Sequence, residues 1–96
     1  MVLHKVQGIL IAAICHGPQV LISAGIVKGR TVTGYLGIKD DLVNAGAVYP
    51  VEPVIVDGNL ITAQHYRDNP AFMREVVDYM RKLQQPEAYA RASHAI

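Results

Sequence analysis

The chain has 96 residues, enough for one small domain with a modest hydrophobic core. Hydrophobic residues make up 51% of the chain and charged residues 18%, a composition that excludes a disordered protein. The formal net charge is only +1, so we expect no binding to nucleic acid or to an anionic membrane. A single cysteine excludes an internal disulfide, and no signal-peptide pattern or membrane-length apolar run occurs, so we expect a soluble, cytoplasmic protein.

The first predicted element is a strand over residues 9–14, an apolar run without a polar residue. So short a run, rich in Ile and bounded by glycines, is typical of a strand buried on both faces. Pro18 suits the first turn of a helix and Gly25 suits its end, which predicts a helix over residues 17–24. Cys15 therefore lies where the strand changes into the helix.

The middle of the chain predicts shorter elements. Residues 31–33 are largely β-branched and predict a short strand, followed by a loop over residues 34–37. Either Asp40 or Asp41 is expected to cap a short helix that ends at Gly46. A further strand over residues 48–51 is at best an edge strand, because Pro50 interrupts it.

The last third predicts a β-hairpin and a long helix. Two apolar runs flank Asp57-Gly58, the signal of a type I′ turn. Asn69 is expected to cap a helix over residues 70–83 that carries one apolar stripe, made of Phe72, Met73, Val76, Val77, Met80 and Leu83. Residues 1–83 would then form an α/β domain with a mixed sheet, and residues 84–96 a polar C-terminal tail.

Cys15 has the surroundings of a nucleophile elbow, a sharp strand-to-helix turn that exposes a reactive side chain. The residues two before and two after it, Ala13 and Gly17, are small, as such a turn requires. The N–H groups at the start of the following helix would favour a thiolate and stabilise an oxyanion, so Gly17 is expected at the oxyanion and substrate-binding site. His16 would act as a general base or an ion-pair partner. The alternative is a buried, inert cysteine.

The elbow reads Ala12-Ala13-Ile14-Cys15-His16-Gly17-Pro18-Gln19. This octet resembles the elbow of the DJ-1/PfpI superfamily, in its PfpI-like intracellular cysteine protease branch. The resemblance covers nearly all of residues 8–83. It implies the C-terminal portion of a flavodoxin-like DJ-1/PfpI sandwich, in a chain that looks truncated relative to the family. It also implies that Tyr35 lies near Cys15 and binds substrate; an ordinary half-exposed loop tyrosine is the alternative.

Two classes of function follow from the resemblance and from Cys15. The first is a cysteine-dependent hydrolase with Cys15 as nucleophile, acting on a peptide or on a small aldehyde in glyoxalase or deglycase chemistry. The second is a non-catalytic stress-response or redox-sensing protein in which Cys15 is oxidised. No metal or other cofactor is expected, because no phosphate loop or dinucleotide fingerprint occurs and the histidines lack ligand spacing; they are His4, His16, His65 and His94.

No acidic residue of this sequence is identified as the partner of the nucleophile Cys15. The resemblance implies that the family's acid comes from the part of the domain that precedes the elbow strand, so Glu52, Glu75 and Glu87 do not inherit the role. A central parallel strand also needs a neighbour on each side. We therefore expect a partner, either a second copy of the chain or a complementing N-terminal half, without which the chain is expected to be inactive.

Overall fold

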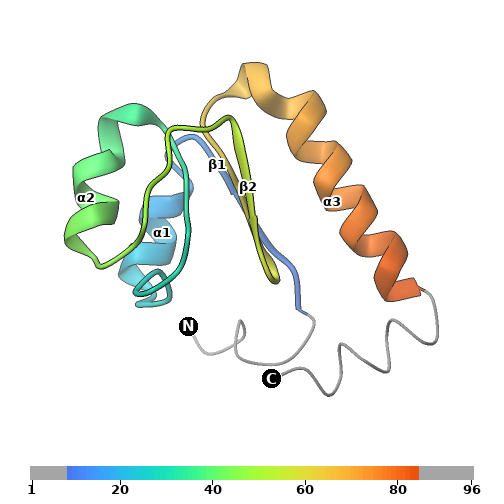
Figure 1. Ribbon diagram of the computed structural model, residues 1–96, viewed down its shortest axis with the longest axis horizontal. Helices are drawn as coiled ribbons and strands as arrows, with labels where there is room; N and C mark the ends of the chain where they lie inside the picture. The colour runs from blue at the N-terminus through green and yellow to red at the C-terminus, as the bar shows by residue number, and fades with distance from the viewer. Residues whose placement is uncertain (1–8, 85–96) are drawn as a thin grey trace.

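A computed structural model describes residues 9–84, in which a three-stranded sheet lies between two helical layers (Figure 1). Its strands are β1 (Ile11–Ile14), β2 (Val54–Asp57) and β3 (Leu60–Ala63). β3 is the middle strand, parallel to β1 and antiparallel to β2. The predicted α/β architecture with a mixed sheet is confirmed.

Helices cover both faces of this sheet. The helical segments are α1 (Pro18–Ser23), η2 (Leu36–Ile38), α2 (Lys39–Asn44), η3 (Tyr66–Asp68) and α3 (Asn69–Gln84). In Figure 1, α1 and α2 lie on one side of the strands and α3 lies on the other. Within residues 9–84, no helix combines the length and the apolar character that crossing a membrane requires.

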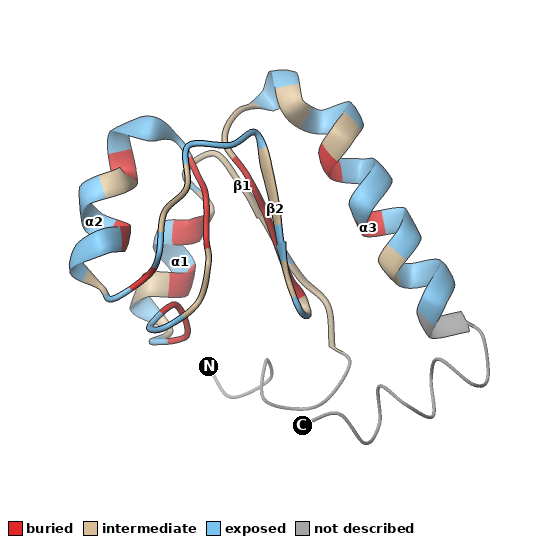
Figure 2. Cartoon of the chain, viewed as in Figure 1, coloured by how far each residue is buried: buried red, intermediate tan, exposed pale blue. Residues whose placement is uncertain are grey.

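The core is divided by β3, whose four residues are all buried. In Figure 2, the buried residues of α1, α2 and α3 face the strands. Successive side chains of a strand point to opposite faces. Leu60 accordingly packs in one cluster with Leu21 of α1 and Leu42 of α2, and Ile61 packs in a second cluster with Phe72 of α3. The two clusters fix the helical layers against the sheet, and β1 places the elbow at one edge of it.

The prediction that the elbow strand is buried on both faces is wrong for the described chain. β1 is shorter than residues 9–14; Ala12 is exposed and its neighbours in the strand are half-buried. The reason is position: among the described strands β1 pairs only with β3, and α3 packs against β2 and β3. The strand buried on both faces is β3.

The two short strands predicted in the middle of the chain reduce to one isolated parallel bridge, between Thr31 and Val48. Thr33 is held by a side chain instead, because its main-chain N–H donates to the hydroxyl of Thr62 at 2.9 Å. Both threonines are fully buried. The segment therefore lies against β3 without joining its ladder.

The hairpin is present, but its turn lies one residue later than predicted. Asp57 pairs with Leu60, which leaves Gly58 and Asn59 as the loop. Only Gly58 has a positive φ there, +59°, which fits a type II′ turn and not the predicted type I′. Asp57 is held in the strand because its carboxylate accepts the N–H of Thr31 at 2.7 Å.

Neither predicted acidic or amide cap is confirmed. Asp40 and Asp41 lie in the first turn of α2, whose N-cap is Ile38 without a side-chain hydrogen bond. Asn69 is already helical, because η3 runs directly into α3 and it is the η3 turn that is capped, by His65. The start of α2 therefore has no side-chain cap, and the η3–α3 segment is capped at His65 and not at Asn69.

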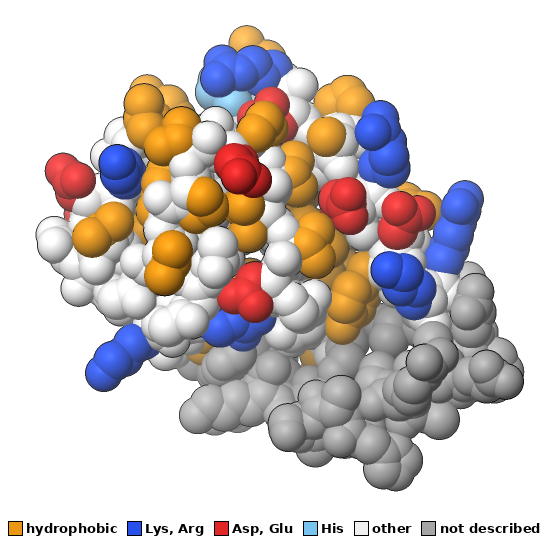
Figure 3. Space-filling model, in the orientation of Figure 1, with side chains coloured by type: hydrophobic (Ala, Val, Ile, Leu, Met, Phe, Trp, Pro, Cys, Tyr) orange, Lys and Arg blue, Asp and Glu red, His pale blue; other side chains and the backbone are white. Residues whose placement is uncertain are grey.

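The apolar stripe of α3 divides into a buried row and an exposed row. Phe72 and Val76 are buried against the sheet, whereas Met73, Val77 and Met80 are 49%, 39% and 49% exposed. Figure 3 shows hydrophobic side chains exposed between charges of both signs on the face in view. Residues 1–8 and 85–96, which include most of the predicted tail, lie outside the described residues.

Candidate active site

Cys15 directly follows β1 and has a backbone φ of +60°, the only positive φ of a non-glycine residue within residues 9–84. An L-residue in this left-handed conformation is strained by roughly 1–2 kcal/mol. Hydrogen bonds hold the turn: the N–H of Cys15 donates to Ala63 O at 3.0 Å, and the N–H of Gly17 donates to Ile14 O at 2.9 Å. The sharp strand-to-helix turn expected from the sequence is therefore present.

The turn leaves little room for a side chain at Gly17. A Cβ added there would lie 3.1 Å from Ile14 O and 3.3 Å from the Cβ of Ala13. The main-chain oxygen cannot move away without distorting β1. This crowding is the physical reason for the two small residues that flank Cys15.

The structure brings Cys15, His16 and Tyr35 together. The Sγ of Cys15, which is half-buried, lies 3.3 Å from Nδ1 of His16. The imidazole of His16 stacks on the ring of Tyr35, with 4.7 Å between centroids and 27° between planes. Such a pair can exchange the thiol proton, and the Tyr35 ring limits the positions open to the imidazole.

The main-chain N–H groups of the elbow differ in availability. The N–H of Gly17 is committed to Ile14 O, so in this conformation it does not face a substrate. Within the described chain, the N–H of His16 has no hydrogen-bond acceptor. The residue after the nucleophile is the one that supplies an oxyanion donor in nucleophile elbows. The sequence analysis expected Gly17 in this role, and the structure adds the amide of His16 as a second candidate.

No described carboxylate makes a hydrogen bond or ion pair with Cys15 or His16. Glu52 and Glu75 are exposed, and Glu87 lies outside the described residues. The described part of the chain also contains no group of three His, Cys, Asp or Glu side chains that could hold a metal ion.

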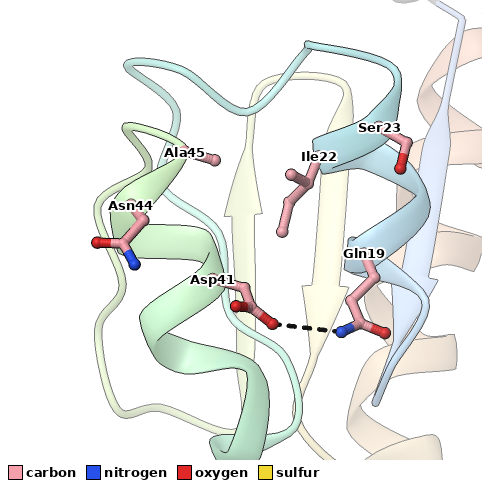
Figure 4. Close-up of a pocket in the computed structure, with 6 residues that line it drawn as sticks. All are labelled: Gln19, Ile22, Ser23, Asp41, Asn44 and Ala45. Atoms are coloured by element: carbon pink, nitrogen blue, oxygen red, sulfur yellow. Dashed lines mark hydrogen bonds between the residues drawn. The ribbon is translucent and has the colours of Figure 1, made fainter.

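An open groove of about 600 Å³ separates α1 from α2. Figure 4 shows Gln19 of α1 and Asp41 of α2 pointing toward one another across it, joined by a hydrogen bond of 3.4 Å. Cys15 does not line this groove. Gln19, although part of the elbow octet, therefore links two helices and does not face the sulfur.

Two polar residues that the sequence prediction missed support the loop beside the elbow. The hydroxyl of Tyr49 donates to Gly34 O at 2.7 Å and accepts from Nε2 of Gln64 at 3.2 Å. Tyr35, which follows Gly34 in the chain, donates its N–H to Cys15 O at 2.7 Å. No motif marks Tyr49 or Gln64, and only the folded chain shows what they contact.

Comparison with known proteins gives a consistent match. The model of the DJ-1/PfpI family matches residues 3–79. The deglycase PfpI of Pyrococcus furiosus is 49% identical over 75 residues, which is 78% of this chain and 45% of that protein. YraA of Bacillus subtilis, named as a candidate cysteine protease, is 46% identical over 69 residues, 72% of this chain and 41% of that protein. The chain thus spans less than half the length of these relatives.

Solved structures show the same fold. A ThiJ/PfpI domain protein from Brachyspira murdochii superimposes with a TM-score of 0.75 at 25% identity, covering 78% of this chain and 43% of that one. A two-domain protein from Anabaena variabilis, with DJ-1/ThiJ/PfpI-like and ferritin-like domains, gives a TM-score of 0.73 at 44% identity, covering 74% of this chain and 21% of that one.

Proposed function

This chain belongs to the DJ-1/PfpI family, and on that premise we propose that it carries the nucleophile of a cysteine-dependent hydrolase. The observation that carries the proposal is the strained Cys15, with φ of +60° and its sulfur 3.3 Å from the imidazole of His16. Strain of this kind is maintained where a reactive side chain has to be presented. The names of the relatives favour deglycase chemistry, on an aldehyde-derived adduct, over peptide hydrolysis.

The chemical step uses groups already described. His16 accepts the thiol proton of Cys15, and the sulfur attacks the carbonyl carbon of the substrate. A C–S bond forms while the carbonyl π electron pair moves onto oxygen, which produces an oxyanion. The free N–H of His16 is in the sequence position to donate to that oxyanion. Tyr35, which stacks on His16, contacts the substrate beside it.

An acidic partner for this step is expected from outside the described residues, since no described carboxylate contacts Cys15 or His16. β1 has an open edge at which another segment could pair, because β1 pairs only with β3 among the described strands. An unpaired strand edge accepts another strand readily. We propose that a second copy or a complementing N-terminal segment covers this edge and supplies the acid.

The test compares the chain with its Cys15→Ser variant on two substrates, glyoxal-modified N-acetylcysteine and a fluorogenic peptide. Cys15-dependent loss of the aldehyde adduct supports the proposal, and equal turnover by Cys15→Ser contradicts it. Cleavage of the peptide alone would select the peptidase activity. Peroxide oxidation of Cys15 in a protein that turns over neither substrate would favour redox sensing instead.

A further inference from the structure

The loop at Gly34 and Tyr35 is packed directly against the elbow. Gly34 is buried, and a Cβ added there would lie 3.0 Å from Cγ of Pro18 and 3.1 Å from Cys15 O. The N–H of Tyr35 donates to the same Cys15 oxygen at 2.7 Å. A side chain at position 34 would therefore crowd the elbow. Because Gly34 O and the N–H of Tyr35 belong to the same peptide group, a displacement of Gly34 O would also disturb the hydrogen bond to Cys15.

Tyr49 also holds Gly34, through a hydrogen bond. Its hydroxyl donates to Gly34 O at 2.7 Å, and its ring packs against the core cluster beside α1 and α2. The ammonium of Lys39 lies 5.9 Å from the ring centroid, within range of a cation–π attraction. Packing and the Lys39 ammonium thus hold the Tyr49 ring in addition to the hydrogen bond of its hydroxyl.

Gln64 fixes the orientation of the Tyr49 hydroxyl. Its Nε2 donates to the Tyr49 oxygen at 3.2 Å, which leaves the hydroxyl proton for Gly34 O. The main-chain N–H of Gln64 donates to Pro53 O at 3.0 Å, directly after β3. The support of the loop is therefore anchored to the sheet.

We propose that Tyr49 is a positioning residue for the nucleophile, acting through Gly34 and Tyr35 on the imidazole of His16. The contacts form one continuous series: Gln64 to Tyr49, Tyr49 to Gly34, Tyr35 stacked on His16, and His16 beside the sulfur of Cys15. This role rests on the proposed function only in treating Cys15 as the nucleophile. The effect of Tyr49 on His16 and Cys15 can be measured by alkylation, without turnover of a substrate.

The test is the variant Tyr49→Phe, which keeps the ring and removes only the hydroxyl. The measured quantity is the rate constant for alkylation of Cys15 by iodoacetamide, as a function of pH. A neutral hydrogen bond is worth about 0.5–1.5 kcal/mol, so we expect a fall of about two- to tenfold near neutral pH. At alkaline pH the thiol ionises without help from His16, and the rates of the two proteins should converge.

Tyr66→Phe is the matched control, because Tyr66 is 73% exposed and should leave the rate unchanged. A Tyr49→Phe protein that is folded, even if less stable, but has the alkylation profile of the original chain would overturn the proposal. If Tyr49→Phe does not fold, Gln64→Met decides: a slower reaction near neutral pH supports the role, and an unchanged one overturns it. This readout does not need turnover, so it tests the role of Tyr49 even in a chain that is inactive because it lacks the acidic partner.

Discussion

The carbonyl oxygen of Cys15 accepts the main-chain N–H of Tyr35 at 2.7 Å, across twenty positions of sequence. The N–H of Cys15 donates to Ala63 O, so hydrogen bonds fix Cys15 on both sides. These two contacts hold Cys15 at a φ of +60° despite its side chain. The strain of the elbow is thus maintained by β3 and by the Tyr35 loop.

The first prediction concerns that strain. Cys15→Gly and Cys15→Ala both remove the thiol, but only glycine adopts a positive φ without steric cost. We expect Cys15→Gly to be at least as stable as Cys15→Ala, whereas at an ordinary position glycine is the less stable by roughly 0.5–1 kcal/mol. Urea denaturation measures the difference. A Cys15→Ala protein that is the more stable by the ordinary margin would show that the elbow is not strained.

Replacement of Gly17 by Val should destabilise the chain. Even a Cβ would lie 3.1 Å from Ile14 O, and the branched side chain adds further crowding against β1. Overpacking of this kind costs about 1–3 kcal/mol. The control is Ala12→Val, which places the same side chain at an exposed position of β1. Equal denaturation midpoints for the two variants would refute the tight turn.

The sequence predicted the parts of this fold that depend on neighbouring residues. The elbow is one, because the apolar run, the two small residues and Pro18 all act within a few positions of Cys15. The start and end of α1 and α3 are others, since the predicted bounds are within one residue of those observed. These features depend on local sterics and on the positions of proline and glycine, which a single sequence displays, whereas the Asn69 cap expected for α3 is absent.

Features that depend on distant contacts were not predicted. Asp57 belongs to β2 and not to the turn because Arg30, far away in sequence, pairs with its carboxylate at 3.2 Å. Thr33 is held by the hydroxyl of Thr62, which no strand propensity indicates. The support of Gly34 by Tyr49 is of the same kind. Each needs the chain to be folded before the two partners meet.

Tyr79 should make stability fall at alkaline pH. It packs beside the α3 cluster, and burial raises its pKa above the ordinary 10.0. Below that pH both folded and unfolded chains keep the phenol proton, so the contribution of Tyr79 to stability is fully present. Above it the unfolded chain releases the proton first, and the free energy of unfolding falls as pH rises toward the folded-state pKa.

The variant Tyr79→Phe removes this titration. The free energy of unfolding of the variant minus that of the original chain should rise between about pH 8 and about pH 11. The reason is that only the original chain has a phenol that ionises more readily in the unfolded state than in the folded state. Urea midpoints at the two pH values measure the change, with Tyr66→Phe as an exposed control. A stability difference between Tyr79→Phe and the original chain that is independent of pH would contradict the assignment.

The most direct test of the elbow as a nucleophile is the rate at which iodoacetamide alkylates Cys15 at about pH 7, where an ordinary thiol is only a few per cent ionised. Cys15 is the only cysteine, so labelling reports on it alone. The folded chain should react faster than the same chain unfolded in urea, and His16→Gln should remove most of that advantage while the fold is retained. A folded chain that reacts no faster than the unfolded chain would contradict an activated Cys15.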